Sequence, residues 1–148
     1  MAIRLSEPSD ANALARMGQA FFDGTPLSGL TEFDPASLFA LITSGDNVAT
    51  FVFEHDGEVM GAVSGVVYPL VFNQKYMVCQ ELFWWADPEA RKMGAGKELH
   101  SHPLEWAKGM GAQAMMMIAI ENDCVKKVER LYNYYGYRKL EHIFIKEI

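Results

Sequence analysis

The residues most suited to chemistry lie in one short basic segment, which reads Arg91-Lys92-Met93-Gly94-Ala95-Gly96-Lys97. Gly94 and Gly96 lack a Cβ atom, so a phosphate group can approach the backbone closely there. The segment follows an apolar run and opens a helical pattern, and a helix N-terminus offers free amides and a positive dipole end to an anion. The spacing predicts a phosphate-binding loop, with a tight turn flanked by solvated cations as the alternative.

Two common phosphate motifs do not fit this segment. A P-loop ending at Gly96-Lys97 would require glycine in place of Arg91 and serine or threonine in place of Glu98. A dinucleotide motif that begins at Gly94 would require a third glycine where Leu99 stands. The sequence therefore supports neither an NTPase nor a Rossmann dehydrogenase.

Hydrophobic periodicity predicts the elements that position the loop. Strands are expected at residues 2–6, 48–54, 59–67, 76–86, 114–120 and 137–148. The pair Asp56-Gly57 predicts a hairpin turn between the second and third of these strands. Helices are expected after Glu7–Asp10 as far as Asp23, from Asp34–Pro35 over Ile42, from Gly94–Gly96 towards Gly109, and over Val125–Tyr135. The strand–helix–strand unit over residues 76–120 needs a crossover, which implies one parallel pair. The expected fold class is α+β, or mixed α/β. The chain length predicts a single domain over residues 1–148.

Composition narrows the classes of partner. The chain has 148 residues, a net charge of -6 and a pI of about 5.2, which disfavours nucleic acid and anionic lipid and suits a cationic partner. It begins without an apolar leader, and its longest charge-free stretch, Met60–Gln74, is short for a membrane span. A cytoplasmic protein without membrane contact is expected. Cys79 and Cys124 are expected to be reduced thiols in or near the core.

Two motifs together carry a family resemblance. The Arg-x-x-Gly-x-Gly loop is preceded by Asp87-Pro88-Glu89 and followed by Leu131-Tyr132-x-x-x-Gly136-Tyr137. This pattern and the element order resemble the GCN5-related N-acetyltransferase (GNAT) superfamily. The resemblance implies a mixed sheet flanked by about four helices, splayed around acetyl-CoA, with a shortened C-terminal strand region.

The resemblance also implies which residues bind acetyl-CoA. The pyrophosphate would be held by the amides of Arg91, Lys92, Met93, Gly94, Ala95, Gly96 and Lys97. The pantetheine arm would lie alongside Phe83, Trp84, Trp85 and Ala86. Because adjacent residues of a strand point to opposite faces, one of the two tryptophans is expected in the core and the other beside the cleft.

Glu81 and Tyr132 are the candidate catalytic residues. An amine is mostly protonated at neutral pH, so the reaction needs a base, and Glu81 is an unexpected charge in an apolar strand. It resembles the general-base Glu of several family members, with a solvent-facing Glu as the alternative. Tyr132 matches the family's general-acid Tyr, with a core aromatic role as the alternative and Tyr134 and Tyr135 as substitutes.

Other residues show departures from the family pattern. Val125 occupies a position where the family often has Asn, and a CoA contact from Asn122 is doubtful. Pro103 is expected to kink its helix. His100 and His102 lack a third ligand nearby, so we expect a surface or kink feature and no metal site.

The expected activity is transfer of acetyl from acetyl-CoA to an amine acceptor by direct attack in a ternary complex. Neither cysteine has a neighbouring His that would indicate a nucleophile. The alternative is a non-catalytic module on a GNAT fold that binds acyl-CoA or a protein. The sequence does not identify the acceptor, which could be a small-molecule or a protein amine. Open sheet edges and the short C-terminal region suggest a homodimer.

Overall fold

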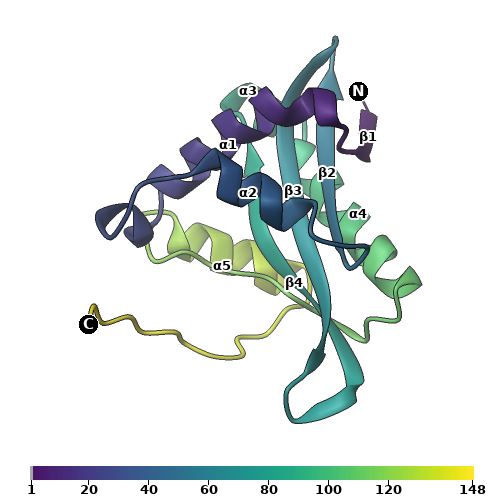
Figure 1. Cartoon of the computed structure of the whole chain (residues 1–148), viewed down its shortest axis with the longest axis vertical. Helices are drawn as coiled ribbons and strands as arrows, with labels where there is room; N and C mark the ends of the chain where they lie inside the picture. The colour runs from purple at the N-terminus through teal and green to yellow at the C-terminus, as the bar shows by residue number, and fades with distance from the viewer. Residues whose placement is uncertain (1) are drawn as a thin grey trace.

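The computed structural model describes residues 2–148, which contain one five-stranded sheet (Figure 1). The strands are β1 (Ala2–Leu5), β2 (Val48–His55), β3 (Glu58–Leu70), β4 (Asn73–Ala86) and β5 (Ala114–Met116), in the spatial order β1-β2-β3-β4-β5. All neighbours are antiparallel except β4 and β5, which are parallel. The mixed α+β class and the single parallel pair are therefore confirmed.

Helices cover both faces of the sheet. They are α1 (Ala11–Asp23), α2 (Pro35–Ile42), α3 (Pro88–Lys92), α4 (Ala95–Gly109) and α5 (Val125–Tyr134), with 3₁₀ turns at Pro8–Asp10 and Pro26–Gly29. Helices α1 and α2 lie on one face, and α4 lies on the other (Figure 1).

The alternation of side chains along each strand explains how one sheet packs against helices on both faces. Val52 of β2 packs in the same apolar cluster as Leu14 and Met17 of α1. Its neighbours on β2, Phe51 and Phe53, pack with residues of α4 instead. Successive side chains of a strand point to opposite faces, so each long strand supplies both cores.

The β2–β3 hairpin was predicted from an Asp-Gly pair, and that prediction is confirmed. Asp56 and Gly57 lie between the two strands and both have positive φ, at 51° and 78°. This combination is typical of the type I′ turns that join twisted antiparallel strands.

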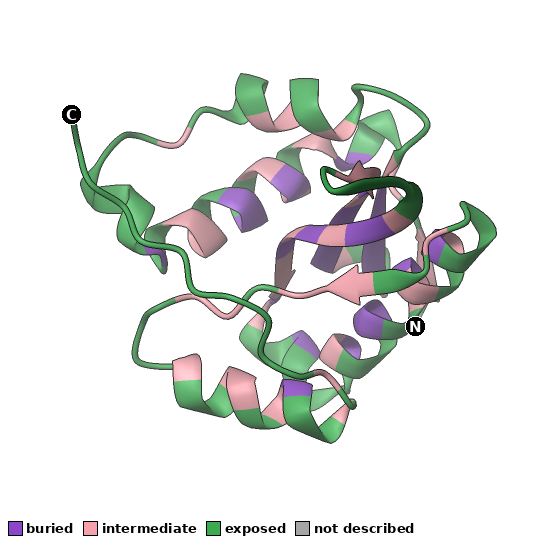
Figure 2. Cartoon of the chain, turned by 90° about the horizontal axis from the view of Figure 1, so that it is seen from below, coloured by how far each residue is buried: buried purple, intermediate pink, exposed green. Residues whose placement is uncertain are grey.

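The C-terminal strand prediction is wrong. Residues 138–148 are exposed, form no strand and donate no backbone hydrogen bond to a described residue. In Figure 2 this segment is green throughout and runs clear of the sheet. Strand β5 is also shorter than the predicted 114–120, because only Ala114–Met116 pair with β4. A β-prone segment becomes a strand only where a partner backbone is available.

Other boundaries differ from expectation in the hairpin and before the loop. Strand β3 ends at Leu70 and strand β4 begins at Asn73, whereas the periodicity of the sequence placed residues 68–75 outside strands. Helix α3 was not predicted, because five residues give too little periodicity. Helix α4 continues through Pro103. Among residues 2–148 no helix is both long and apolar enough to cross a membrane.

Candidate active site

The predicted phosphate loop lies at the junction of α3 and α4. Gly94 is the N-cap of α4 in the left-handed conformation, with φ of 84°. The amides of Lys97 and Glu98 donate to the Gly94 carbonyl, whereas those of Ala95 and Gly96 donate to no oxygen of residues 2–148. The start of α4 therefore presents two free N–H groups, which is the arrangement that binds an anion.

Gly96 is not required by the fold itself. Its φ lies outside the positive range, and a Cβ atom there would meet only Trp84 Cζ2, at an ordinary contact distance of 3.6 Å. By contrast, the positive φ of Gly94 favours glycine at that position whether or not a ligand binds. The fold alone therefore does not account for a glycine at position 96.

The cations of the loop have different surroundings. Arg91 Nε donates to the Ala86 carbonyl at 2.6 Å, and its guanidinium lies 4.8 Å from the Trp85 ring centroid. Lys92 pairs with Glu89 at 3.0 Å on the surface. Met93 and Lys97 are exposed. Arg91 therefore ties α3 to the end of β4, and Lys97 is the cation best placed to meet a ligand.

A second ion pair, which the sequence did not predict, fixes the start of α3. Asp87 is the N-cap of α3, and its carboxylate accepts from both terminal nitrogens of Arg16 on α1, at 2.9 and 2.7 Å. Trp85 Nε1 also donates to Asp87, at 2.9 Å. These contacts anchor the loop to α1, and no sequence spacing links residues 16 and 87.

Strand β4 has an irregular register next to the predicted pantetheine segment. Ser64 pairs with Phe83 and Gly65 with Glu81, so Leu82 is bulged out of the ladder. Strand β5 pairs only with Val78–Gln80, so β4 continues beyond it to Ala86 without a strand on that side. The two strands therefore part at Glu81.

Trp84 and Trp85 point to opposite faces, as predicted. Trp85 packs in the α1-side cluster with the buried Phe83, whereas Trp84 packs on the α4 side, as does Ala86. The Trp84 ring lies 6.3 Å from that of Tyr132, with 20° between the planes. Trp84 is thus the tryptophan that lies between the loop helix and Tyr132.

Glu81 and Tyr132 meet at the backbone of one residue, Ile118. Glu81 Oε2 accepts from the Ile118 amide at 3.0 Å, and the Tyr132 hydroxyl donates to the Ile118 carbonyl at 2.7 Å. The hydroxyl lies 3.4 Å from Glu81 Oε2. Glu81 is only 2% exposed, so the solvent-facing alternative does not hold. The role of the Ile118 backbone was missed because backbone groups leave no mark in a residue pattern.

Burial changes the acidity of both side chains. It raises the pKa of the Glu81 carboxyl to about 7, although the bonds from Ile118 and Tyr132 partly oppose this. Burial and the nearby Glu81 raise the pKa of the Tyr132 phenol above its ordinary value. Glu81 therefore titrates close to neutral pH while Tyr132 stays protonated.

The raised pKa of Glu81 predicts a pH-dependent stability. The ordinary carboxyl pKa of 4.5 applies to the unfolded chain, so the folded protein binds the extra proton between that pH and about 7. Raising the pH through this window should cost roughly 3 kcal/mol of unfolding free energy. We expect Glu81→Gln to remove this loss, as measured by denaturant unfolding at about pH 5 and about pH 8. If the unfolding free energy of Glu81→Gln depends on pH as that of the wild type does, Glu81 is not the group that titrates in this window.

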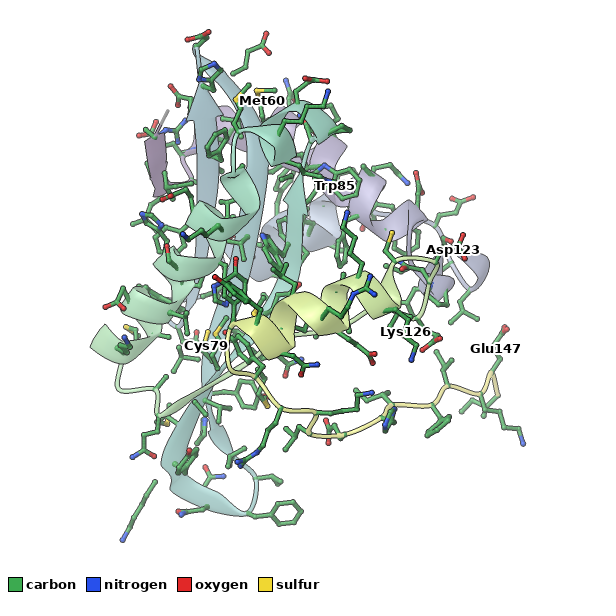
Figure 3. The ribbon with its side chains drawn as sticks, turned by 180° about the vertical axis from the view of Figure 1, so that it is seen from behind. Met60, Cys79, Trp85, Asp123, Lys126 and Glu147 are labelled. Atoms are coloured by element: carbon green, nitrogen blue, oxygen red, sulfur yellow. The ribbon has the colours of Figure 1, made fainter. Side chains whose placement is uncertain are left out.

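The substitute tyrosines do not reach this centre. Tyr134 is 84% exposed, and Tyr135 stacks on His100 with 4.2 Å between ring centroids. Asn122 donates to the Gly24 carbonyl at 2.8 Å and so joins the start of α5 to the end of α1. Figure 3 shows α5 running from Asp123 and Lys126 towards Cys79 of β4, which brings Tyr132 beside the point where β4 and β5 part.

Two expectations from the sequence are corrected. His100 is buried, at 6% exposed, and is not a surface feature. Cys79 is buried but Cys124 is exposed at the start of α5, so only the former packs in the core. No group of three or more His, Cys, Asp or Glu side chains within residues 2–148 is arranged to hold a metal ion.

A hollow of about 590 Å³ lies elsewhere, where β1 and β2 meet α1 and α2. Its lining includes Leu5, Phe39, Ile42 and Trp106 and contains none of the candidate site residues. Its lining also includes polar residues, Glu7, Asp46 and Thr50 among them, so the hollow is a mixed surface separate from the candidate site.

Comparison with known proteins identifies the family. The family model described as "Acetyltransferase (GNAT) family" matches residues 15–137. The chain belongs to the GNAT acetyltransferase family. The match includes the loop, Glu81, Tyr132 and Tyr137, which confirms the resemblance seen in the sequence. A comparison with curated protein sequences finds no significant match.

Solved structures share the GNAT fold. AAC(6')-Iy, in complex with the bisubstrate analog CoA-S-monomethyl-acetylneamine, is 15% identical with a TM-score of 0.77, covering 99% of this chain and 97% of that one. A Trypanosoma brucei acetyltransferase is 22% identical with a TM-score of 0.76, covering 99% of both chains. A ribosomal-protein-alanine N-acetyltransferase from Brucella melitensis biovar Abortus 2308 is 13% identical with a TM-score of 0.76, covering 100% of both. At these identities the likeness shows the GNAT fold alone.

Proposed function

We propose that the protein transfers the acetyl group of acetyl-CoA to an amine acceptor, by direct attack in a ternary complex. The observation that carries this proposal is the start of α4, where two free amides adjoin a glycine that the fold does not need. The Trp84 side chain links this start to Tyr132, because it lies beside Gly96 and its ring is 6.3 Å from that of Tyr132. Tyr132 and Glu81 lie where β4 and β5 part.

The loop supports binding of the CoA pyrophosphate. The amides of Ala95 and Gly96 would donate to its oxygens, and the α4 dipole favours the negative charge. Lys97 would add a cation, while Arg91 acts by holding α3 against β4. AAC(6')-Iy was crystallised with CoA and with a CoA-containing analog, and its fold matches this chain end to end.

The free edge of β4 supports binding of the pantetheine arm. From Leu82 to Ala86 no strand formed by residues 2–148 pairs with β4 on the β5 side. The backbone of Phe83, Trp84, Trp85 and Ala86 would therefore pair with the amide groups of the arm, as an added strand would.

Tyr132 would protonate the departing CoA thiolate. Its hydroxyl has one proton, which now goes to the Ile118 carbonyl. Rotation about the bond from the ring to the hydroxyl redirects that proton without moving the ring. The raised pKa keeps the phenol protonated until the thiolate forms.

Glu81 would accept the proton of the attacking amine, through a water because the carboxylate is buried. A base must be ionised, so the activity should fall as the pH drops below about 7, the pKa of Glu81. Glu81→Gln should depress kcat/KM mainly below the pKa of the acceptor amine and recover at higher pH, where solvent supplies the free amine. The check is a pH–rate profile of both proteins. A loss of equal size at every pH would show that Glu81 only positions other groups.

The acceptor is proposed to be a cationic amine, either a small molecule or a protein amine. The chain carries a net charge of -6, and amines are cations at neutral pH. Two structural neighbours are named as an aminoglycoside N-acetyltransferase and a ribosomal-protein-alanine N-acetyltransferase. These names support an amine as the class and leave the individual acceptor to experiment.

One observation favours a second function, a non-catalytic module that binds acyl-CoA or a protein. Both candidate catalytic groups already have protein partners, because Glu81 accepts from Ile118 and Tyr132 donates to it. Release of CoA in the presence of an amine panel separates the two functions. The panel should include a polyamine, an aminoglycoside and a lysine-containing peptide. Acetyl-CoA binding without CoA release from any of them would favour the module.

We also propose a cytoplasmic homodimer that completes the acceptor groove. Strand β5 has three paired residues and an open outer edge, and the segment 138–148 exposes Leu140, Ile143, Phe144, Ile145 and Ile148. An open edge beside exposed apolar residues favours pairing with a second copy. Light scattering at high micromolar concentration should give the mass of a dimer, and the mass of a monomer would contradict this.

A further inference from the structure

His100 is a buried polar side chain that the proposed chemistry does not use. It lies on α4, one turn after Gly96, and is 6% exposed. Its Nε2 atom is 2.9 Å from the Tyr137 hydroxyl, and its ring stacks on Tyr135 at 4.2 Å with 7° between the planes. The Trp84 ring centroid lies 6.0 Å away. A buried imidazole with a hydrogen bond and an aligned stack has a fixed position.

The partners of His100 are directly connected to Tyr132. The Tyr137 amide donates to the Tyr132 carbonyl at 3.0 Å, in the bond that ends α5 after Gly136. The rings of Tyr132 and Tyr137 lie 5.7 Å apart. Tyr137 and Tyr132 are therefore joined by one ring contact and one backbone hydrogen bond.

Apart from the bonds of the Tyr132 hydroxyl to Ile118 and Glu81, helix α5 has few anchors. Tyr132 is its only buried residue. Within residues 2–148, the contact between His100 and Tyr137 is the only side-chain hydrogen bond that joins α4 to α5 or the residues after it. An amphipathic helix with one buried side chain depends on such contacts for its exact place on the sheet.

We propose that His100 is a positioning residue: through Tyr137 it fixes the C-terminal end of α5 against α4, and so holds the Tyr132 hydroxyl beside Glu81. This inference rests on the proposed acetyl transfer, in which Tyr132 must reach the departing sulfur. Small displacements of a reacting group cause large losses of rate. His100 would thus couple the loop helix to the general acid.

The test compares variants that keep the ring but remove the hydrogen bond. His100→Phe and Tyr137→Phe should each lower kcat about tenfold, with the KM for acetyl-CoA unchanged within about twofold. The double variant should be no worse than either single variant, because both remove the same contact. His100→Gln returns a polar group to Tyr137 and should recover part of the lost kcat. His102→Phe is the matched control and should keep the wild-type kcat, because His102 is a half-buried histidine of the same helix whose ring lies 5.9 Å from that of Phe51 and which has no hydrogen bond to Tyr137.

The same variants have a readout that does not need activity. Deuterium exchange of the peptide covering residues 130–137 should be faster in His100→Phe than in wild type and His102→Phe, with exchange in α4 unchanged. If the wild type releases no CoA with the amine panel, the proposed function fails and this exchange alone decides the inference. A wild-type kcat in His100→Phe, a parallel loss of acetyl-CoA affinity and kcat, or unchanged exchange would each overturn it.

Discussion

Gly96→Val should abolish measurable binding of acetyl-CoA while the protein stays folded. The valine methyl groups would occupy the space above the free amides of Ala95 and Gly96 and keep a pyrophosphate away. Hydrogen bonds to a charged group contribute about 1.5–3 kcal/mol each, so loss of two predicts at least about a hundredfold weaker binding. Calorimetric titration measures this directly.

Folding of Gly96→Val should be preserved, because the backbone conformation there suits any residue and the nearest side chain is at an ordinary distance. Gly109→Val is the matched control, since Gly109 ends the same helix and a Cβ atom there meets nothing within 4 Å. It should bind like the wild type. A folded Gly96→Val protein with unchanged affinity would remove the loop from the binding site.

Tyr132→Phe should lower kcat by about a hundredfold with little change in acetyl-CoA affinity. The phenyl ring keeps the packing against Trp84 and Tyr137, but the proton donor is lost. The substitution also leaves the Ile118 carbonyl without its hydroxyl partner, which should cost about 1 kcal/mol of stability. Steady-state kinetics with the acceptor from the amine panel, together with calorimetry, separates these effects.

Tyr134→Phe serves as the control for Tyr132→Phe. Tyr134 is on the same helix and is 84% exposed, so removal of its hydroxyl should change neither kcat nor affinity. Wild-type turnover by Tyr132→Phe would transfer the acid role to water and would refute the role carried over from the family.

The sequence predicted the parts of the fold that depend on local pattern. The period-2 runs around Asp56-Gly57, the capped start of α2 at Asp34 and the glycine stop of α5 all match the structure. The prediction for residues 137–148 is wrong because strand formation depends on a partner, and β propensity does not show whether one is present. The short β5 has a similar cause, since Glu81 takes the Ile118 amide just beyond it.

The candidate site was predictable where side-chain type and spacing carry the information. Gly94 and Gly96 were singled out in this way, and Glu81 and Tyr132 were singled out with the help of the family resemblance. The structure brings Glu81 and Tyr132 to within 3.4 Å of each other. Contacts that join distant segments were not predictable. The pair of Arg16 and Asp87 and the pair of His100 and Tyr137 span 71 and 37 positions of the chain, and neither has a local spacing signal.

The most direct test of acetyl transfer uses acetyl-CoA with a deuterated acetyl group. The protein is incubated with this compound, with and without the amine that releases CoA fastest. The masses of the amine and of the protein are then measured by mass spectrometry. Acetyl transfer by direct attack predicts the deuterated acetyl group on the amine, an unmodified protein in both samples, and no labelled amine with Gly96→Val. Tight binding of acetyl-CoA without label on any amine, or label on the protein itself, would contradict it.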